Sequence, residues 1–226
     1  MAAELAKLME IEVRSFGDQN IKGLNPSVEG YDYENDAFAK ADSQLKALLQ
    51  TISTGTHMNI KPVDADVVHC HTWYSHFAGI LAKLCYGTPL VVTTHSLEPL
   101  RPWKRNQLGR GYDASSWIEK TAIEMADAVI AVSKETKEDV LNYFNVDEKK
   151  IQVIYNGINL EQYQKTTEAS ALKKHQINTE KPFVLFVGRI TQQKGIIHLV
   201  NAIKYIHPDT QVVLKKGAVI LAGFTL

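Results

Sequence analysis

The sequence predicts an α/β protein built on parallel sheets, because strand patterns and helix patterns alternate along it. They recur at spacings of roughly 20 to 35 residues, which suits right-handed crossovers between parallel strands. The clearest unit lies at residues 182–203. Phe183–Val187 is a short apolar run typical of a buried strand, Gly188 allows a tight turn, and apolar residues then recur at helical spacing up to Ile203. We therefore expect an open sheet with both faces covered.

The same patterns assign the remaining elements in order. Strands are expected at residues 11–16, 65–71, 90–94, 128–132, 151–154, 183–187 and 211–214. Helices are expected at residues 2–9, 35–53, 76–86, 114–126, 134–144 and 196–203, with Ser133 as an N-cap. Glycine, proline and polar residues predict a long loop at 19–34, a linker at 54–62 and an irregular loop at 97–111. Long loops of the last kind are usually either functional or disordered.

A polar stretch at residues 156–181 divides the chain into two expected domains, 1–155 and 182–226. The first expected element is a helix with no strand before it, and the sequence stops soon after the second expected sheet has begun. Two or three strands do not bury both of their faces. We therefore expect a fragment, truncated at both ends. Residues 214–226 continue neither pattern, and the origin of 215–226 stays open.

Composition excludes several classes of function. The chain has 226 residues, with 25 Lys plus Arg against 25 Asp plus Glu, so no net charge favours nucleic acid or an acidic membrane as a partner. No apolar run approaches the ~20 residues of a membrane span, and the first residues lack the features of a signal peptide. Cys70 and Cys85 form no metal-binding spacing and no disulfide framework. We expect a cytoplasmic protein.

The turn at residues 188–195 is the first candidate site. A helix that starts at the carboxyl edge of a parallel sheet presents an anion-binding end. Arg189 and Lys194 flank this turn with two positive charges, and Gly188 lets the backbone approach a ligand. A phosphate or diphosphate suits such a corner. The alternative reading, two ordinary surface charges, stays open at this point.

Residues 66–76 form the second candidate site. His71 falls at the carboxyl end of an expected strand, where ligands bind in this class of sheet. Trp73 and Tyr74 follow it, and aromatic rings beside a polar group suit the faces and hydroxyls of a sugar. The alternative is a buried strand with a satisfied histidine, which we favour for His69. A zinc site fails on geometry, because alternation directs Cys70 away from the two histidines.

Two further segments follow strand ends. His95 lies one residue past the strand at 90–94, so it is expected on the same edge. Beyond it, Trp103 either caps a pocket or packs the loop down, and the nearby cations either meet phosphate or solvate the loop. These cations are Arg101, Lys104 and Arg105. Asn156, at the turn after residues 151–154, is either a plain turn residue or a residue that faces a cleft between two lobes.

Five segments together carry a resemblance. They read VVHCHTWYSHFAGILAKL, VVTTHSLEPLRPWK, SSWIEKTAIEMADAVIAVS, VIYNGIN and VLFVGRITQQKG. In this order and spacing they resemble a glycogen or starch synthase of the retaining GT-B type, in the glycosyltransferase family 4-like short form of bacteria and archaea. The likeness covers most of residues 2–214.

The resemblance implies two facing Rossmann-like domains with the active site in the cleft between them. Residues 1–155 would be the acceptor-side domain without its first strand, 156–181 the hinge, and 182–226 the start of the donor domain. The implied reaction moves glucose from ADP-glucose or UDP-glucose to the non-reducing end of an α-1,4-glucan, with retention. The family's first strand and Gly-rich loop, and its Glu-rich donor segment, are not found here. The chain alone is therefore expected to have little or no transferase activity.

The resemblance also assigns roles by position. Arg189 and Lys194 match the family's pair on the donor diphosphate, and His71 matches the cleft histidine near the reacting glucose. His95 and Asn156 match cleft-lining positions. No metal and no cofactor are implied, since the two cations supply the charge that a metal would otherwise provide.

Two other readings stay open. Another enzyme of the same fold would build a glycolipid, a disaccharide or maltose 1-phosphate, so the acceptor is either a polymer or a sugar phosphate. A non-catalytic glucan-binding lobe would bind maltooligosaccharide without turnover. A dehydrogenase or epimerase is a weaker idea, because the sequence lacks GxGxxG after its first strand.

Overall fold

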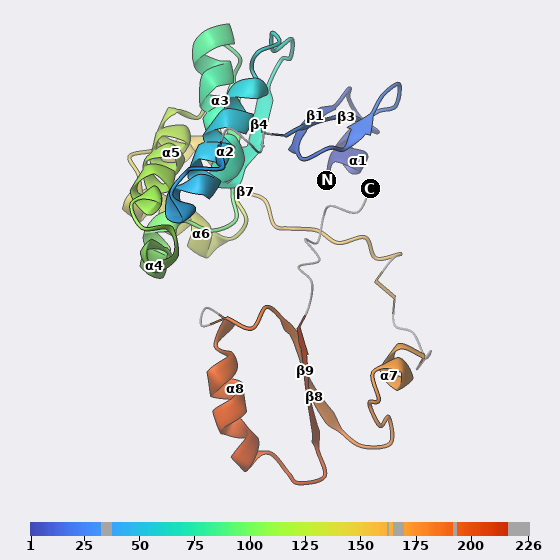
Figure 1. Cartoon of the computed structure of the whole chain (residues 1–226). Helices are drawn as coiled ribbons and strands as arrows, with labels where there is room; N and C mark the ends of the chain where they lie inside the picture. Colours follow the sequence, from blue (N-terminus) through green and yellow to red (C-terminus); the bar gives the residue numbers. More distant parts are fainter. Residues whose placement is uncertain (33–37, 162, 165–169, 192–193, 217–226) are drawn as a thin grey trace. The chain divides into compact units, whose positions relative to one another are not determined.

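Figure 1 shows a computed structural model of the chain, which describes residues 1–32, 38–161, 163–164, 170–191 and 194–216. The chain forms two compact units, Met1–Gly157 and Ile158–Leu226. The predicted α/β class with parallel strands is confirmed in both. The role of residues 156–181 as a hinge stays a prediction.

The main sheet of the first unit contains four parallel strands in consecutive order. They are β4 (Val68–His71), β5 (Leu90–Thr94), β6 (Ala128–Ala131) and β7 (Ile151–Val153). His71 pairs with Thr93, so the carboxyl ends of β4 and β5 lie side by side. Consecutive parallel strands joined by right-handed crossovers place their connecting helices on one face. The segments that follow β4 and β5 therefore both begin at the same edge of the sheet.

The longer helices of this unit pack on that sheet and on one another. They are α2 (Ser43–His57), α3 (Thr72–Tyr86), α5 (Gly111–Met125) and α6 (Lys134–Tyr143). Helix α3 contacts β4 and β5, α6 contacts β6 and β7, and α2 packs beside α3 and α5 (Figure 1). Leu90 and Val92 of β5 are fully buried under them, whereas Val91, which points to the other face, is half-buried. Among the residues that the structure describes, the helices therefore bury one face of this sheet more fully than the other.

Gly79 brings α3 close to the sheet. A Cβ atom there would lie 2.5 Å from Sγ of Cys70 and 2.7 Å from a methyl group of Leu90. Any other residue here would force the buried side chains of Cys70 and Leu90 to shift, because real Cβ atoms do not approach other heavy atoms so closely.

The prediction of a loop at residues 19–34 was wrong. The segment contains β2 (Asn20–Ile21) and β3 (Ser27–Tyr31), and β3 pairs in parallel with β1 (Glu12–Phe16). Pro26 precedes the first residue of β3, where it removes no ladder hydrogen bond. Gly30 fits because its backbone lies against Gly17, with no room for a side chain. Pro26 and Gly30 are both typical of loops, but here one precedes a short strand and the other lies within it.

Several boundaries also differ from prediction. Helix α2 starts at Ser43 and not at 35, because the Asp42 side chain accepts a hydrogen bond from the backbone N–H of Gln44 at 2.8 Å. It extends into the predicted linker as far as His57, with Thr54 and Gly55 buried. Residues 33–37 lie outside the described residues. The first helix, α1, covers only Ala2–Leu5, and α3 begins at Thr72, four residues before its predicted start.

The irregular loop at 97–111 is more ordered than expected. It holds two 3₁₀ turns, η2 (Glu98–Leu100) and η3 (Pro102–Lys104), followed by α4 (Arg105–Leu108). A third, η4 (Glu148–Lys150), precedes β7.

The second unit contains a parallel pair, β8 (Phe183–Gly188) and β9 (Gln211–Lys216). They are joined through α8 (Ile196–Ala202) and η6 (Ile203–Tyr205), and α7 (Ser170–Lys174) precedes them. The strand, turn and helix predicted for this region are confirmed. The tail at 217–226 lies outside the described residues. Among the described residues, no helix is both long enough and apolar enough to cross a bilayer.

Candidate functional site at the carboxyl ends of β4 and β5

Two histidines meet at the carboxyl edge of the main sheet. His71 is the last residue of β4, and His95 directly follows the last residue of β5. Nδ1 of His71 lies 3.0 Å from Nε2 of His95, and the two rings stack with centroids 5.3 Å apart. The predicted placement of both residues at one edge is confirmed. Their part in binding or catalysis stays a prediction.

The alternation predicted for β4 is also confirmed. The rings of His69 and His71 lie on one face with centroids 4.4 Å apart, while Cys70 is buried on the other. Nε2 of His69 lies 2.7 Å from the hydroxyl of Thr93 on the neighbouring strand. His69 is therefore held within the sheet, as expected for a structural residue.

The site keeps its imidazoles neutral. Burial, followed by the neighbouring rings of His69 and His95, lowers the pKa of His71 to about 4. Burial also lowers the pKa of His69 and that of His95. Near neutral pH each ring thus has one N–H donor and one acceptor nitrogen, so the site offers hydrogen bonds rather than positive charge. Nε2 of His71 is buried, and no described residue gives it a hydrogen-bond partner.

The turn after His71 has an unusual backbone. Thr72 has a φ of 62°, which a β-branched residue rarely adopts. Ser75 stabilises the turn: its hydroxyl donates to the carbonyl of His71 at 2.7 Å and accepts from the His71 N–H at 2.9 Å. Strained backbone of this kind often lies beside functional residues.

The two aromatic residues predicted to cover a sugar differ in their surroundings. Trp73 is 2% exposed and belongs to the hydrophobic core, so its ring has no free face here. Tyr74 is 47% exposed, and its ring stacks on Trp73 with centroids 4.2 Å apart. Of the two, only Tyr74 presents a surface to a ligand in this structure.

Sequence reasoning missed two buried polar groups. His76 is 1% exposed, and neither of its ring nitrogens has a partner among the described residues. Its burial lowers its pKa to about 3. Glu98 is fully buried, and it accepts hydrogen bonds from Arg101 at 2.6 Å and Lys104 at 2.7 Å. In the sequence, the only indication of the cluster of Glu98, Arg101 and Lys104 is one acid followed by three cations in SLEPLRPWKR.

The other predicted site residues lie elsewhere. Asn156 is exposed, three residues after β7, which is separated from β5 by β6. In the second unit, Gly188 ends β8, and Arg189 and Lys194 are both exposed near the start of α8. The contribution of these four residues to one site stays a prediction.

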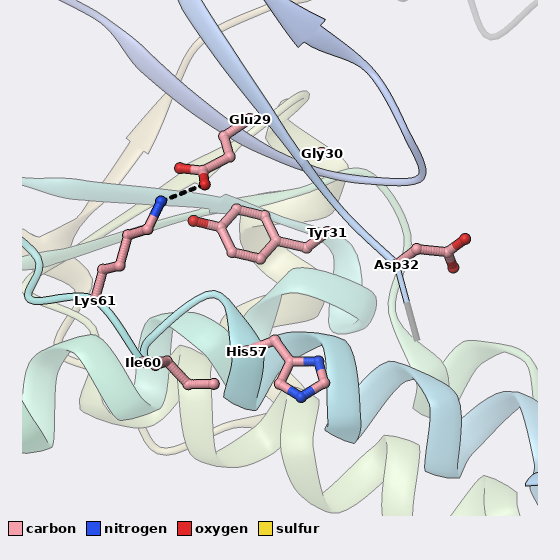
Figure 2. A pocket seen from close by; sticks show the side chains of 7 residues that line it. All are labelled: Glu29, Gly30, Tyr31, Asp32, His57, Ile60 and Lys61. Carbon is pink, nitrogen blue, oxygen red and sulfur yellow. Dashed lines mark hydrogen bonds and ion pairs between the residues drawn. The ribbon is translucent and has the colours of Figure 1, made fainter. Parts of the chain in front are cut away.

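A cavity of about 340 Å³ lies between β3 and the end of α2 (Figure 2). In Figure 2, the Lys61 ammonium group reaches the Glu29 carboxylate beside the hydroxyl group of Tyr31. The lining residues are Glu29, Gly30, Tyr31, Asp32, His57, Ile60 and Lys61. None of the predicted site residues lines this cavity. Within the described ranges, no three His, Cys, Asp or Glu side chains gather as a metal site requires.

Comparison with solved structures defines the class of fold. Sucrose-phosphate synthase from Thermosynechococcus elongatus matches 96% of this chain and 55% of its own, with a TM-score of 0.73 and 20% identity. Anabaena HepE in complex with UDP-glucose matches 91% of this chain and 60% of its own, with a TM-score of 0.58 and 14% identity. The chain thus has the α/β fold of the GT-B glycosyltransferases.

The family follows from sequence. The model of Glycosyltransferase Family 4 matches residues 38–162, more than half of the chain, so this chain belongs to glycosyltransferase family 4. The alpha-maltose-1-phosphate synthase of Mycolicibacterium smegmatis is 42% identical over 226 residues, which cover 96% of this chain and 55% of that protein. The chain therefore spans about half the length of this relative. The expected family 4 and GT-B membership is confirmed, whereas the finer expectation of a glycogen synthase is not.

Proposed function

We propose that this chain is part of a glucosyltransferase that forms maltose 1-phosphate from a nucleoside diphosphate glucose and α-glucose 1-phosphate. One observation carries the proposal: identity of 42% along 96% of the chain with an alpha-maltose-1-phosphate synthase. The nucleotide-sugar donor is supported by the fold shared with a protein that binds UDP-glucose. The identity of its base, adenine or uracil, is left to the experiment below.

The proposed reaction is a glucosyl transfer with retention. The bond between C1 of the donor glucose and the diphosphate oxygen breaks, and a bond from C1 to O4 of the acceptor glucose forms. The O4 proton passes to the departing diphosphate. The donor and the new linkage are both α, so the configuration at C1 is retained.

The residues divide into two groups in this proposal. Arg189 and Lys194 stabilise the negative charge that develops on the diphosphate, so we expect the reaction to need no metal ion. His95, which is exposed, acts as a neutral hydrogen-bonding group for sugar hydroxyls, because burial lowers its pKa. His71 lies beside it as the proposed cleft histidine and holds the His95 ring through the contact between Nδ1 and Nε2. Tyr74, with its exposed ring, is the proposed aromatic contact. Asn156 and Gly188 are proposed as further substrate contacts.

A glycogen synthase is the second candidate, favoured by the five sequence segments that resemble that class. The two candidates share donor and fold and differ in the acceptor. A sugar phosphate carries negative charge at its reducing end, whereas a glucan presents only hydroxyls.

Turnover by a two-domain enzyme separates the candidates. The aligned segment of the M. smegmatis relative is replaced by this chain, and the chimera is incubated with ADP-glucose or UDP-glucose. Its acceptors are α-glucose 1-phosphate, glycogen and maltoheptaose, and mass spectrometry identifies the products. The proposal predicts a disaccharide phosphate from α-glucose 1-phosphate. Elongation of glycogen with no consumption of α-glucose 1-phosphate would contradict it.

A further inference from the structure

The segment Glu98–Lys104 holds two cations and an exposed aromatic ring around one buried acid. It begins three residues after His95, so the Cα atoms of His95 and Glu98 are at most about 11 Å apart. Two 3₁₀ turns, each with a proline near its start, restrict its backbone. The segment is therefore a rigid feature close to the edge where the imidazoles meet.

Glu98 anchors the segment from inside. Its backbone N–H donates to Glu119 at 2.6 Å, its carbonyl accepts from the hydroxyl of Tyr112 at 2.6 Å, and its carboxylate accepts from Ser115 at 3.3 Å. All three partners lie on α5. Burial of a carboxylate is costly unless it is paired, and Arg101 and Lys104 provide that pairing.

The two cations keep unused hydrogen-bonding capacity. Both contact the same oxygen, Oε1 of Glu98, although a guanidinium has five N–H donors and an ammonium three. Nε of Arg101 is buried without a partner among the described residues. Burial raises the pKa of Glu119 to about 7, so this second acid is only partly ionised near neutral pH. The two positive charges of Arg101 and Lys104 are therefore not fully balanced by the negative charge on Glu98 and Glu119.

Trp103 lies between these cations in sequence and is 42% exposed. Its ring is therefore accessible to a ligand, within a segment that holds Pro99 and Pro102. Beside two cations it matches the two parts of a sugar phosphate: a ring for the apolar face of the hexose, and positive charge for the phosphate.

We propose that Arg101 and Lys104 bind the phosphate of the acceptor hexose 1-phosphate, and that Trp103 covers its sugar ring. This inference rests on the proposed function, which gives the acceptor its phosphate. Glu98 is a positioning residue, because it holds the two cations at a fixed separation.

The test is isothermal titration calorimetry on the full chain with α-glucose 1-phosphate, inorganic phosphate and glucose. We expect α-glucose 1-phosphate to bind and inorganic phosphate to compete with it. R101Q and K104Q should each weaken both phosphate ligands by about tenfold or more, since each removes a charge-assisted contact. W103A should weaken α-glucose 1-phosphate but not inorganic phosphate.

Matched controls are available in the same unit. R105Q removes a neighbouring exposed cation that pairs with Asp113, and W117A removes a tryptophan that is 58% exposed on α5. Both should keep the wild-type Kd. Circular dichroism verifies folding, and K104R, which keeps the charge beside Glu98, should retain most of the affinity.

Three results would overturn the assignment. They are wild-type affinity in folded R101Q and K104Q, an unchanged affinity of W103A for α-glucose 1-phosphate, or no competition by inorganic phosphate at millimolar concentration. If the chimera forms maltose 1-phosphate while these variants bind normally, only this inference fails. If it elongates glycogen alone, the proposed function fails, whatever the segment binds.

Discussion

The imidazoles of His71 and His95 share a single hydrogen bond of 3.0 Å, which joins the ends of two neighbouring parallel strands. One ring must donate and the other accept, so protonation of both would place two donors against each other. The pair is a stable unit only while at least one ring is neutral.

We predict that His71 stays neutral from pH 8 down to about pH 5, because burial and the neighbouring imidazoles lower its pKa to about 4. The measurement is the pH dependence of the histidine Cε1–H signals by NMR, with H71Q to assign the resonance. A midpoint for His71 near 6.5 would show that its environment does not disfavour the charged form.

His76 should make the first unit sensitive to acid. Its pKa is about 3 in the folded chain, below its ordinary value of 6.5, so the unfolded chain binds more protons between these values. Stability is therefore lost as the pH falls through 6.5, by about 2 kcal/mol between pH 7.5 and pH 5. H76L should remove this part of the loss. Urea unfolding at both pH values measures it through tryptophan fluorescence, since all three tryptophans lie in this unit. An equal loss in wild type and variant would refute the prediction.

Glu119 should act in the opposite direction. Its pKa is raised from 4.5 to about 7, mainly by burial, and Glu98, Arg101 and Lys104 are its charged neighbours. The folded chain binds more protons between these values, so stability falls as the pH rises, by about 2 kcal/mol between pH 5 and pH 7.5. E119Q still accepts the hydrogen bond from the N–H of Glu98 and does not ionise. Its stability relative to wild type should increase from pH 5 to pH 7.5, and a constant difference across this range would contradict the assignment.

Replacing Gly79 by alanine should destabilise the first unit by about 1–3 kcal/mol. The added Cβ would lie 2.5 Å from Sγ of Cys70 and 2.7 Å from a Leu90 methyl group, and this clash outweighs the gain in helix propensity. G157A is the matched control, because a Cβ at Gly157 meets no atom within 4 Å. The double variant C70A/G79A should recover part of the loss. Urea midpoints check all three, and a G79A chain as stable as G157A would show that α3 does not approach the sheet so closely.

Much of this arrangement was predictable from sequence, because it depends on local patterns. The apolar runs at residues 90–94 and 128–132 predicted β5 and β6, and the histidines at two strand ends predicted a shared polar edge. Parallel strands bring such residues together whatever the rest of the chain does. The same pattern predicted the strand, turn and helix of the second unit.

The features that escaped prediction depend on contacts distant in sequence. Strand β3 was not predicted because Pro26 and Gly30 are residues typical of loops. They occur in this strand because it pairs with β1. The burial of Trp73 is decided by packing against the core and not by its two neighbours in sequence. The anchoring of Glu98 requires partners on α5, more than ten residues away, which no local pattern reveals.

Under both proposals, the β4–β5 edge and the segment after it receive a phosphorylated sugar. The most direct measurement is an NMR titration of the labelled chain with α-glucose 1-phosphate, glucose and maltoheptaose. We expect saturable shifts of the His71 and His95 ring signals with α-glucose 1-phosphate, and none with glucose at the same concentration. Shifts with maltoheptaose alone, or unchanged spectra with all three sugars, would contradict it.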